Sequence, residues 1–237
     1  AKKNPHSMGA WSSESKSHVA SMSDNDFFGS EKSTTISGAT EVKIEFVGND
    51  GTVKELKSAF PLLDKEVIDT SVMKKKALVE FFEKEIAEAK AQDVLLSLHM
   101  KATMMKVSHP IVFGHCVRTF YREAFEKHGA LFDQLGINVN NGMVDLYNKI
   151  ATLPQSQQDE IKRDLHACHE HRPELAMVDS AKGITNFHSP NDIIVDASMP
   201  AMIRAGGLMW GPDGKMYETK AVLPESTFAR TCSSPST

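Results

Sequence analysis

Two side chains suited to acid–base and metal chemistry follow apolar runs of this sequence. Lys101 comes directly after "VLLSLHM" (94–100), and Asp196 comes directly after "IIV" (193–195). If both runs are strands of one sheet, the loops at their carboxyl ends lie at the edge where α/β proteins collect their chemistry. Placement alone also allows a solvated lysine and a helix-capping or turn-forming aspartate, and for the aspartate this second role is the more common one.

A lysine and a carboxylate at one edge would suit one class of reaction. The carboxylate would hold a divalent ion that prefers oxygen ligands. The nearby cation would lower the proton affinity of the lysine, so that the lysine could exchange protons near neutral pH. This combination suits the oxidation of a hydroxy acid followed by loss of CO2.

The cysteines and clustered histidines have simpler explanations than catalysis. "HACHEHRP" places His166, Cys168, His169 and His171 close together, and a zinc or nickel site is conceivable. On a helix, however, His166 and His169 share a face while Cys168 points elsewhere, and no second ligand cluster follows. We therefore favour a solvated helix end. Cys116 lies in an amphipathic pattern and is expected to be buried and unreactive.

Other polar side chains near the two runs are expected to support a site. Arg204 belongs to the same element as Asp196 and could pair with a substrate acid, although a structural salt bridge is at least as common. His18 and His188 are expected to be loop residues or neighbours of a site, not ligands. "KATMMK" contains two methionines that are expected to fill space beside the site.

Composition excludes several classes of protein. The chain has 237 residues, of which 41% are hydrophobic and 24% charged, with a net charge of −4, so it has no electrostatic reason to bind nucleic acid or an acidic membrane. Its 3 cysteines show no framework spacing, which favours a reducing compartment. No apolar run approaches the roughly 18 residues of a membrane helix, and no signal peptide is evident. We expect a cytoplasmic protein.

The pattern between residues 42 and 92 predicts a hairpin followed by a helix. "VKIEFV" (42–47) alternates apolar and charged residues, and "GNDG" separates it from "TVKELKSAF" (52–60), as in two antiparallel strands joined by a turn. From Ser71 to Gln92, apolar residues recur at spacings of three and four among lysines and glutamates. This spacing is typical of an amphipathic helix, with Ser71 as the expected N-cap.

Beyond the strand expected at 94–100, helices alternate with short apolar runs. We expect a helix over 110–129, with Pro110 in its first turn and Gly129 past its end. The remaining expected elements are helices near 141–151 and 156–170, apolar runs at 174–178 and 192–199, a short helix ended by glycines at 200–207, and a strand at 216–224. This alternation indicates an α/β fold, with a mixed sheet that bears the hairpin and helices packed on its faces.

The two ends of the chain differ in composition from the middle. Residues 1–37 are rich in serine and glycine, and we expect a loop-rich segment that packs on the domain, because Trp11, Phe27 and Phe28 need burial. Residues 38–228 should form the α/β part. Residues 229–237 are polar and are expected to be a disordered tail. The start without methionine and this tail lead us to expect that both ends are cut or altered.

Four long stretches of the sequence resemble successive segments of the monomeric-type NADP-dependent isocitrate dehydrogenases. They are "NPHSMGAWSSESKSHVASM", "HMKATMMKVSHPIVFGH", "AMVDSAKGITNFHSPNDIIVDASMPAMIR" and "MWGPDGKMYETKAVLPES". From about Lys3 to about Phe228 they keep the order of that family and nearly its spacing, and motifs of this length are highly specific. The resemblance implies an isocitrate/isopropylmalate dehydrogenase-like fold, with isocitrate as substrate, NADP as cofactor, and Mg²⁺ or Mn²⁺ as the metal.

The resemblance also assigns roles to the two residues singled out above. The lysine of the family's "KATMMK" motif is essential for catalysis, which implies that Lys101 exchanges a proton with the C2 hydroxyl of isocitrate. The aspartate of "IVDASMPAMIR" ligates the metal that holds isocitrate, which implies the same role for Asp196. The implied reaction is oxidative decarboxylation of isocitrate to 2-oxoglutarate and CO2, with reduction of NADP.

The sequence departs from the family in its length. Family members carry an arginine- and serine-rich isocitrate-binding segment before this region, and a tyrosine, an arginine, two further metal aspartates and the NADP phosphate-binding residues after it. No residue here is therefore expected to bind NADP, and "GPDG" (211–214) is expected to be a turn.

Two interpretations of this shortness remain open. In the first, the chain is a portion of the enzyme whose residues act beside the missing parts, or beside a separately encoded remainder. In the second, it is a folded but inactive remnant that acts at most as a binding or interaction domain. Both interpretations predict exposed apolar surface where the remainder would dock, and hence self-association through that surface.

Overall fold

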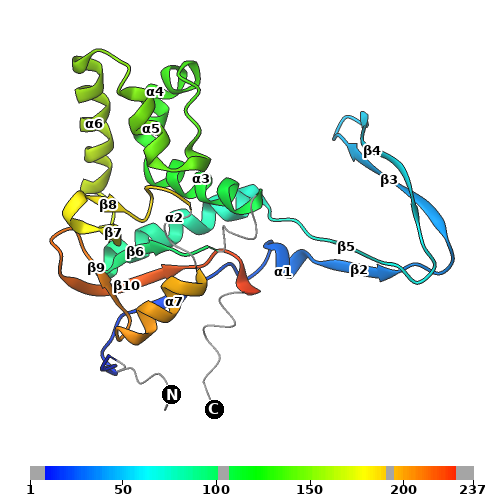
Figure 1. The fold of residues 1–237 in the computed structure, drawn as a ribbon, viewed down its shortest axis with the longest axis horizontal. Coiled ribbons are helices and arrows are strands. Elements are labelled where there is room, and N and C mark those ends of the chain that lie inside the picture. Colours follow the sequence, from blue (N-terminus) through cyan, green and yellow to red (C-terminus); the bar gives the residue numbers. More distant parts are fainter. Residues whose placement is uncertain (1–8, 101–106, 191–194, 228–237) are drawn as a thin grey trace.

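The computed structural model describes residues 9–100, 107–190 and 195–227, with the side chains of residues 195 and 196 excepted (Figure 1). Lys101, the two methionines of "KATMMK" and the tail expected at 229–237 therefore lie outside the described residues. Asp196 is described only as backbone.

A mixed sheet forms the centre of the molecule. In the described part of the chain its strands are β1 (His18–Ala20), β6 (Leu95–Leu98), β9 (Leu208–Trp210) and β10 (Met216–Val222). β10 lies between β1 and β6 and runs parallel to both, while its first residues pair antiparallel with β9. The α/β fold with a mixed sheet is confirmed. Because β1, β6 and β10 are parallel, their carboxyl ends meet at one edge.

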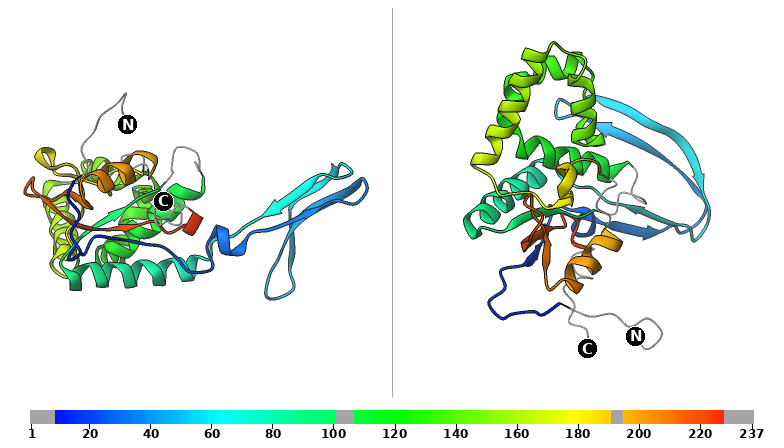
Figure 2. Two further views of the ribbon diagram at one scale, coloured as in Figure 1. Left: turned by 90° about the horizontal axis from the view of Figure 1, so that it is seen from below. Right: turned by 60° about the vertical axis from the view of Figure 1, so that its left-hand side comes forward.

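Successive side chains of β10 point to opposite faces of the sheet, and a helix covers each face (Figure 2). Val222 belongs to the large core cluster that also contains the buried face of α2 (Lys75–Gln92). Ala221 and Leu223 pack with Met199 and Met202 of α7 (Val195–Arg204). The alternation along this one strand therefore fixes which helix lies on which face.

A buried lysine joins β10 to α2. The side chain of Lys220 is only 1% exposed, and its Nζ forms ion pairs with Glu85, which is also buried, and with Glu88 at 2.7 Å. The hydrogen bond and charge of Lys220 hold the pKa of Glu88 below its usual value. A lysine with its charge inside a protein is stable only when it is paired in this way, so the position of α2 on the sheet depends on these contacts.

Several helices and short strands complete the body beside α2. They are α3 (Ser108–Phe120), α4 (Arg122–Gln134), η1 (Val139–Asn141), α5 (Met143–Ile150), α6 (Gln155–Glu170), β7 (Met177–Asp179), η2 (Ser180–Lys182) and β8 (Ile184–Thr185). The rings of Phe113 and Phe120 meet Phe187 edge-on at 6.1 and 5.3 Å between centroids, and all three residues are buried. No helix in the described ranges is long and apolar enough to cross a membrane.

Two helix boundaries differ from the expected ones. The helix expected over 110–129 is two helices, because Tyr121 (φ −108°, ψ 31°) leaves the helical region, and Gly129 lies inside α4 instead of past its end. Ser71 is not an N-cap, since α2 begins at Lys75. The residues before α2 are held extended: the Val72 N–H donates to Ser30 Oγ at 2.8 Å, and Ser30 Oγ donates to the Val72 carbonyl at 2.6 Å.

A long two-stranded ribbon projects from the body (Figure 1). Near the body, β2 (Lys32–Thr35) pairs with β5 (Val67–Thr70), and farther out β3 (Thr40–Val47) pairs with β4 (Val53–Leu62). The expected hairpin is confirmed, with Gly51 in the left-handed region of its turn (φ 81°). The hairpin forms a sheet of its own, however, and does not join the central sheet.

The N-terminal segment packs on the body through its backbone more than through its aromatic rings. As expected, part of it packs against the sheet, since β1 pairs with β10. Burial of Trp11 and Phe28 is not observed, because both side chains are exposed. Trp11 instead donates its indole N–H to the Ile203 carbonyl at 3.1 Å and covers Gly207, where a Cβ would come within 2.9 Å of the ring.

A buried aspartate fastens the base of the ribbon to the segment after β10. Asp26 caps α1 (Phe27–Ser30) by accepting from the Gly29 N–H at 2.9 Å, and it also accepts from the Ser226 N–H at 2.7 Å. Burial by itself raises the pKa of Asp26, but the hydrogen bonds from Ser226 and Gly29 outweigh burial and leave this pKa below its usual value. The ribbon therefore starts close to the carboxyl edge of the sheet.

Removing the charge of Lys220 should destabilise the fold strongly. In Lys220→Met, the buried Glu85 loses its buried partner and keeps only the exposed Lys84, whose Nζ lies 3.5 Å away, so we expect the free energy of unfolding to fall by about 3 kcal/mol, at the low end for a broken buried pair. Lys182→Met is the control, because the Lys182 side chain is exposed and its pair with Asp179 at 3.1 Å should contribute less than about 1 kcal/mol. Urea unfolding followed by circular dichroism measures both. Adding Glu85→Gln to Lys220→Met should restore part of the loss, and equal losses in the two lysine variants would contradict the argument.

Candidate functional site

The carboxyl edge of the central sheet brings together segments that are far apart in the sequence. His99 follows β6, Glu225 lies just beyond β10, and His109 is in the first turn of α3. These three buried side chains line a small cavity of about 10 Å³, which is room for roughly one water molecule. The edge at which the chemistry was expected is thus tightly packed, with these polar groups among apolar side chains such as Met73, Val112 and Leu223.

A hydrogen bond joins the end of β6 to the first turn of α7. Nδ1 of His99 lies 2.6 Å from Oγ of Ser198, and His99 is only 1% exposed. Burial lowers the pKa of His99 to about 3, so its imidazole is neutral at neutral pH. Lys101 follows His99 by two residues, and Asp196 precedes Ser198 by two. The bond therefore connects the segments that carry the two predicted site residues.

The element that contains Asp196 differs from the expected one. α7 begins at Val195, so Asp196 lies in the first turn of a helix and does not directly follow a strand. Pro200 is inside this helix, and a proline lacks the N–H that would bond to the carbonyl four residues earlier, here that of residue 196. The expected glycine ending is confirmed, since Gly206 and Gly207 have φ values of 72° and 85°.

Arg204 lies at the opposite end of α7 from Asp196. Its side chain is exposed, and its carbonyl accepts from the Gly9 N–H at 2.5 Å. Among the described residues no carboxylate forms an ion pair with it. Both roles considered for Arg204, in substrate binding and in a structural salt bridge, remain predictions.

The histidine cluster of α6 is partly solvated and partly structural. His166 and His171 are exposed, as expected for a helix end. His169 is half-buried and its Nε2 lies 3.0 Å from the Tyr121 hydroxyl, while Cys168 is buried and donates to Glu123 at 3.5 Å. Within the described ranges these residues do not gather into a metal-binding group. One side of α6, with His166, is therefore solvated, whereas the side with Cys168 and His169 contacts the body of the protein.

The expected burial of Cys116 is confirmed, and burial raises the pKa of its thiol. A thiol in such a position is mostly protonated at neutral pH and is a poor nucleophile.

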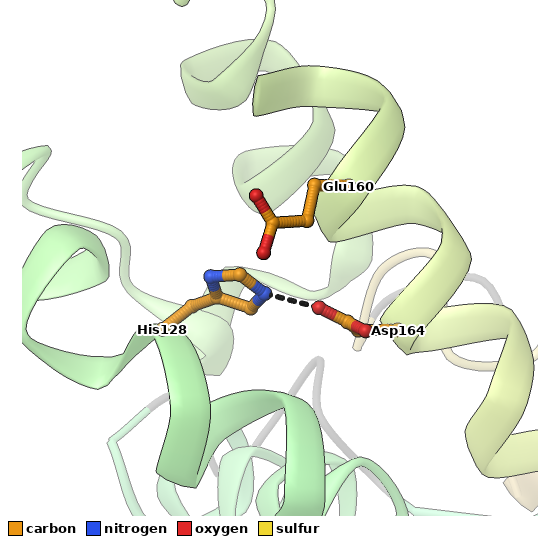
Figure 3. Close-up of side chains that lie close together, drawn as sticks. All are labelled: His128, Glu160 and Asp164. Atoms are coloured by element: carbon orange, nitrogen blue, oxygen red, sulfur yellow. Dashed lines mark hydrogen bonds and ion pairs between the residues drawn. The ribbon is translucent and has the colours of Figure 1, made fainter. Parts of the chain in front are cut away.

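Sequence reasoning missed a cluster between α4 and α6 (Figure 3). The ligand atoms of His128, Glu160 and Asp164 lie within 4.8 Å of one another, with His128 Nε2 2.6 Å from Asp164. Lys127 already pairs with Glu160 at 2.9 Å and with Asp164 at 2.8 Å. The cluster is therefore an ion-pair network that fastens two helices. Glu160 and Asp164 are four residues apart, which places them on one helix face, and from this spacing the cluster could have been predicted.

Comparison with known proteins identifies the family of the chain. The family model of monomeric isocitrate dehydrogenase matches residues 1–234. The isocitrate dehydrogenase [NADP] 2 of Psychrobacter sp. (strain 13A) is 64% identical over 97% of this chain, and that of Mycobacterium tuberculosis is 62% identical over 97%. The isocitrate dehydrogenase [NADP] of Azotobacter vinelandii is 56% identical over 97%. The chain belongs to the monomeric isocitrate dehydrogenase family.

The chain spans 31% of the length of these three relatives. A crystal structure of isocitrate dehydrogenase from Ostreococcus tauri, in complex with isocitrate and magnesium(II), aligns with 85% of this chain and 36% of that one. Its TM-score of 0.41 and sequence identity of 11% are too low to carry an argument.

Acid should destabilise the fold through His169. Burial lowers the pKa of His169 to about 4, whereas an unfolded chain binds the same proton near pH 6.5. The unfolded state therefore takes up this proton first, so the contribution is complete above about pH 6.5 and is lost as the pH falls toward 4. His169→Gln retains a polar group beside Tyr121 without the titration, and it should remove on the order of 2 kcal/mol of the pH dependence.

Urea unfolding between pH 7.5 and 4.5 measures this difference. The exposed His171 is the matched control, because it does not contribute to the lowered pKa of His169, and His171→Gln should follow the wild-type pH profile. If His169→Gln and His171→Gln gave the same profile, the assigned role of burial at His169 would be wrong.

Proposed function

We propose that this chain supplies the catalytic lysine and one metal-binding aspartate of an NADP-dependent isocitrate dehydrogenase, which converts isocitrate to 2-oxoglutarate and CO2. The observation that carries the proposal is the bond between His99 and Ser198. This bond joins the strand end that precedes Lys101 to the helix turn that contains Asp196. Membership in the family and identities of 62–64% over nearly the whole chain support it.

Lys101 would exchange a proton with the C2 hydroxyl of isocitrate during the oxidation. It would act directly, or through a tyrosine supplied by the rest of the enzyme. A lysine can do this near neutral pH only when its pKa is lowered, and a nearby cation lowers it because two positive charges repel. The lysine has to stand near the metal site, and the connected segments of β6 and α7 favour that arrangement.

Asp196 would provide one carboxylate ligand for Mg²⁺ or Mn²⁺. When bound, such an ion stabilises negative charge on the C2 oxygen of the substrate. These ions take several oxygen ligands, whereas the described neighbour His99 is a neutral imidazole, a ligand that suits zinc or copper better. The residues present thus fit one position of the metal site and do not complete it, so we place the remaining ligands and the NADP-binding residues outside this chain.

The proposal extends to the organisation and location of the chain. We retain residues 1–37 as a segment that packs on the domain, 38–228 as the α/β part of the enzyme, and 229–237 as a tail. We also propose a cytoplasmic location, because the 3 cysteines lack the spacing of a disulfide framework, which favours a reducing compartment.

The ribbon favours a second role as an interaction element. Ile44 and Phe46 are 48% and 58% exposed, and Val47, Val53 and Leu56 are also exposed. An isolated two-stranded ribbon is marginally stable in water, and exposed apolar patches mark interaction sites. We propose that the ribbon docks on the remainder of the enzyme chain, and that the chain by itself self-associates through the ribbon even if it is catalytically inactive.

A chimera tests the enzymatic proposal. This chain replaces the matching 230 residues of the Psychrobacter enzyme, to which it is 64% identical, and NADPH formation from isocitrate, NADP and Mn²⁺ is followed by absorbance. We expect the chimera to turn over and Lys101→Met to lower its rate by about 10²–10⁴-fold. Asp196→Asn should raise the Mn²⁺ concentration needed for activity, because one ligand loses its charge. The isolated chain should be inactive.

Lys182→Met is the matched control in that chimera, since the exposed Lys182 pairs only with the half-buried Asp179 among described carboxylates. A folded chimera without turnover, or one in which Lys101→Met behaves like Lys182→Met, would refute the assigned function.

Sedimentation velocity tests the role of the ribbon. The wild-type chain should self-associate as its concentration rises, and Ile44→Glu with Phe46→Glu should shift it to monomer, because charges oppose burial of the ribbon face. Tyr147→Glu is the control, since Tyr147 is comparably exposed on α5, away from the ribbon. A wild-type chain that stays monomeric at high concentration would count against this proposal.

A further inference from the structure

We infer that His99 and Ser198 are positioning residues, which together set the separation of the lysine-bearing end of β6 from the aspartate-bearing turn of α7. The inference rests on the proposed function. Neither residue was singled out from the sequence as part of a site. What points to them is a contact of 2.6 Å between a side chain directly after one element and a side chain in the first turn of another, 99 residues apart.

The bonds from Trp11 to the Ile203 carbonyl and from Gly9 to the Arg204 carbonyl hold the last turn of α7, whereas the His99–Ser198 bond is at its first turn. Met199 and Met202 contact Ala221 and Leu223 on β10, and these contacts are apolar. Methionine side chains are flexible and adapt to small shifts of a helix. A hydrogen bond in a buried setting has a narrow range of distance and angle. The His99–Ser198 bond can therefore fix the helix against the end of β6, where apolar contacts alone would tolerate sliding.

The energetics of His99 also point to a role beyond filling space. The residue is almost fully buried, and among the described residues its Nε2 has no hydrogen-bond partner. The small cavity beside it has room for roughly one water molecule. Burial of an imidazole costs free energy that leucine or methionine of similar volume would not incur, so a histidine in this position is expected where function constrains the residue.

The two anchors are close enough to the proposed site residues to control them. Lys101 and Asp196 are each two residues from an anchor in the sequence, and two residues of fully extended chain span at most about 7 Å. A displacement of about 1 Å at a reacting group can lower a rate by about 10²-fold. Losing the bond should therefore affect the rate more than the binding of substrate.

Paired substitutions in the chimera separate positioning from mere stability. Ser198→Ala removes the hydroxyl and Ser198→Thr keeps it; His99→Gln moves the polar group away from the Nδ1 position and His99→Asn keeps one there. We expect Ser198→Ala and His99→Gln to lower kcat by on the order of 10–100-fold with a smaller change in KM for isocitrate. Their conservative counterparts should stay within a few-fold of the parent.

All four variants are assayed well below their melting temperatures, so that unfolding does not contribute. If Ser198→Ala keeps the kcat of Ser198→Thr, or if KM changes while kcat does not, the positioning role is overturned.

Hydrogen exchange on the isolated chain gives a readout that does not depend on turnover. Ser198→Ala should speed amide exchange in peptides covering both 94–100 and 197–204, and Ser198→Thr should not, because one bond links the two segments. An inactive chimera would refute the proposed function while this measurement still tests the link. Exchange that rises in one segment only, or in neither, would overturn the inference on its own.

Discussion

Parallel pairing of β10 with both β1 and β6 is the constraint on which the rest of the molecule depends. Parallel neighbours cannot be joined by a tight turn, so the chain leaves β6, builds the helical body, and returns to the sheet through α7 and β9 before entering β10. This route places α7 on the face opposite α2 and gathers the carboxyl ends of three strands at one edge. The candidate site is a consequence of that topology.

The strand at the centre of the sheet is held in two physically different ways. On the α7 face, Ala221 and Leu223 make apolar contacts, which are non-directional. On the α2 face, the buried Lys220 forms ion pairs with the buried Glu85 and with the partly exposed Glu88, and a buried charge that loses its partner is strongly destabilising. α2 is thus attached by charge as well as by its apolar face, whereas α7, which carries the proposed metal ligand, has neutral hydrogen bonds at its two ends, between Ser198 and His99 and between Trp11 and the Ile203 carbonyl.

Patterns within one segment could be predicted from the sequence, and contacts between distant segments could not. The hairpin and the strand at β6 follow from alternation and buried runs, and α5 and α6 follow from helical spacing. The start of α2 was misplaced because Ser30, far earlier in the chain, holds Val72 extended. The break at Tyr121 has the same kind of cause, since its ring and hydroxyl pack on Phe187 and His169.

The fold and the site differ in how much of each is contained in this chain. The core closes on itself, because the buried faces of α2, β6, α3 and β10 meet one another through residues such as Phe82, Leu96 and Val222. The site does not close in the same way, since a Mg²⁺ or Mn²⁺ shell needs several oxygen ligands and Asp196 is one. The chain can therefore keep its fold although its metal site needs ligands from elsewhere, provided that His99 and Ser198 fix the end of β6 against the first turn of α7. The exposed apolar ribbon fits this incomplete ligand set. The remainder of the enzyme that would cover the ribbon would also supply the missing metal ligands.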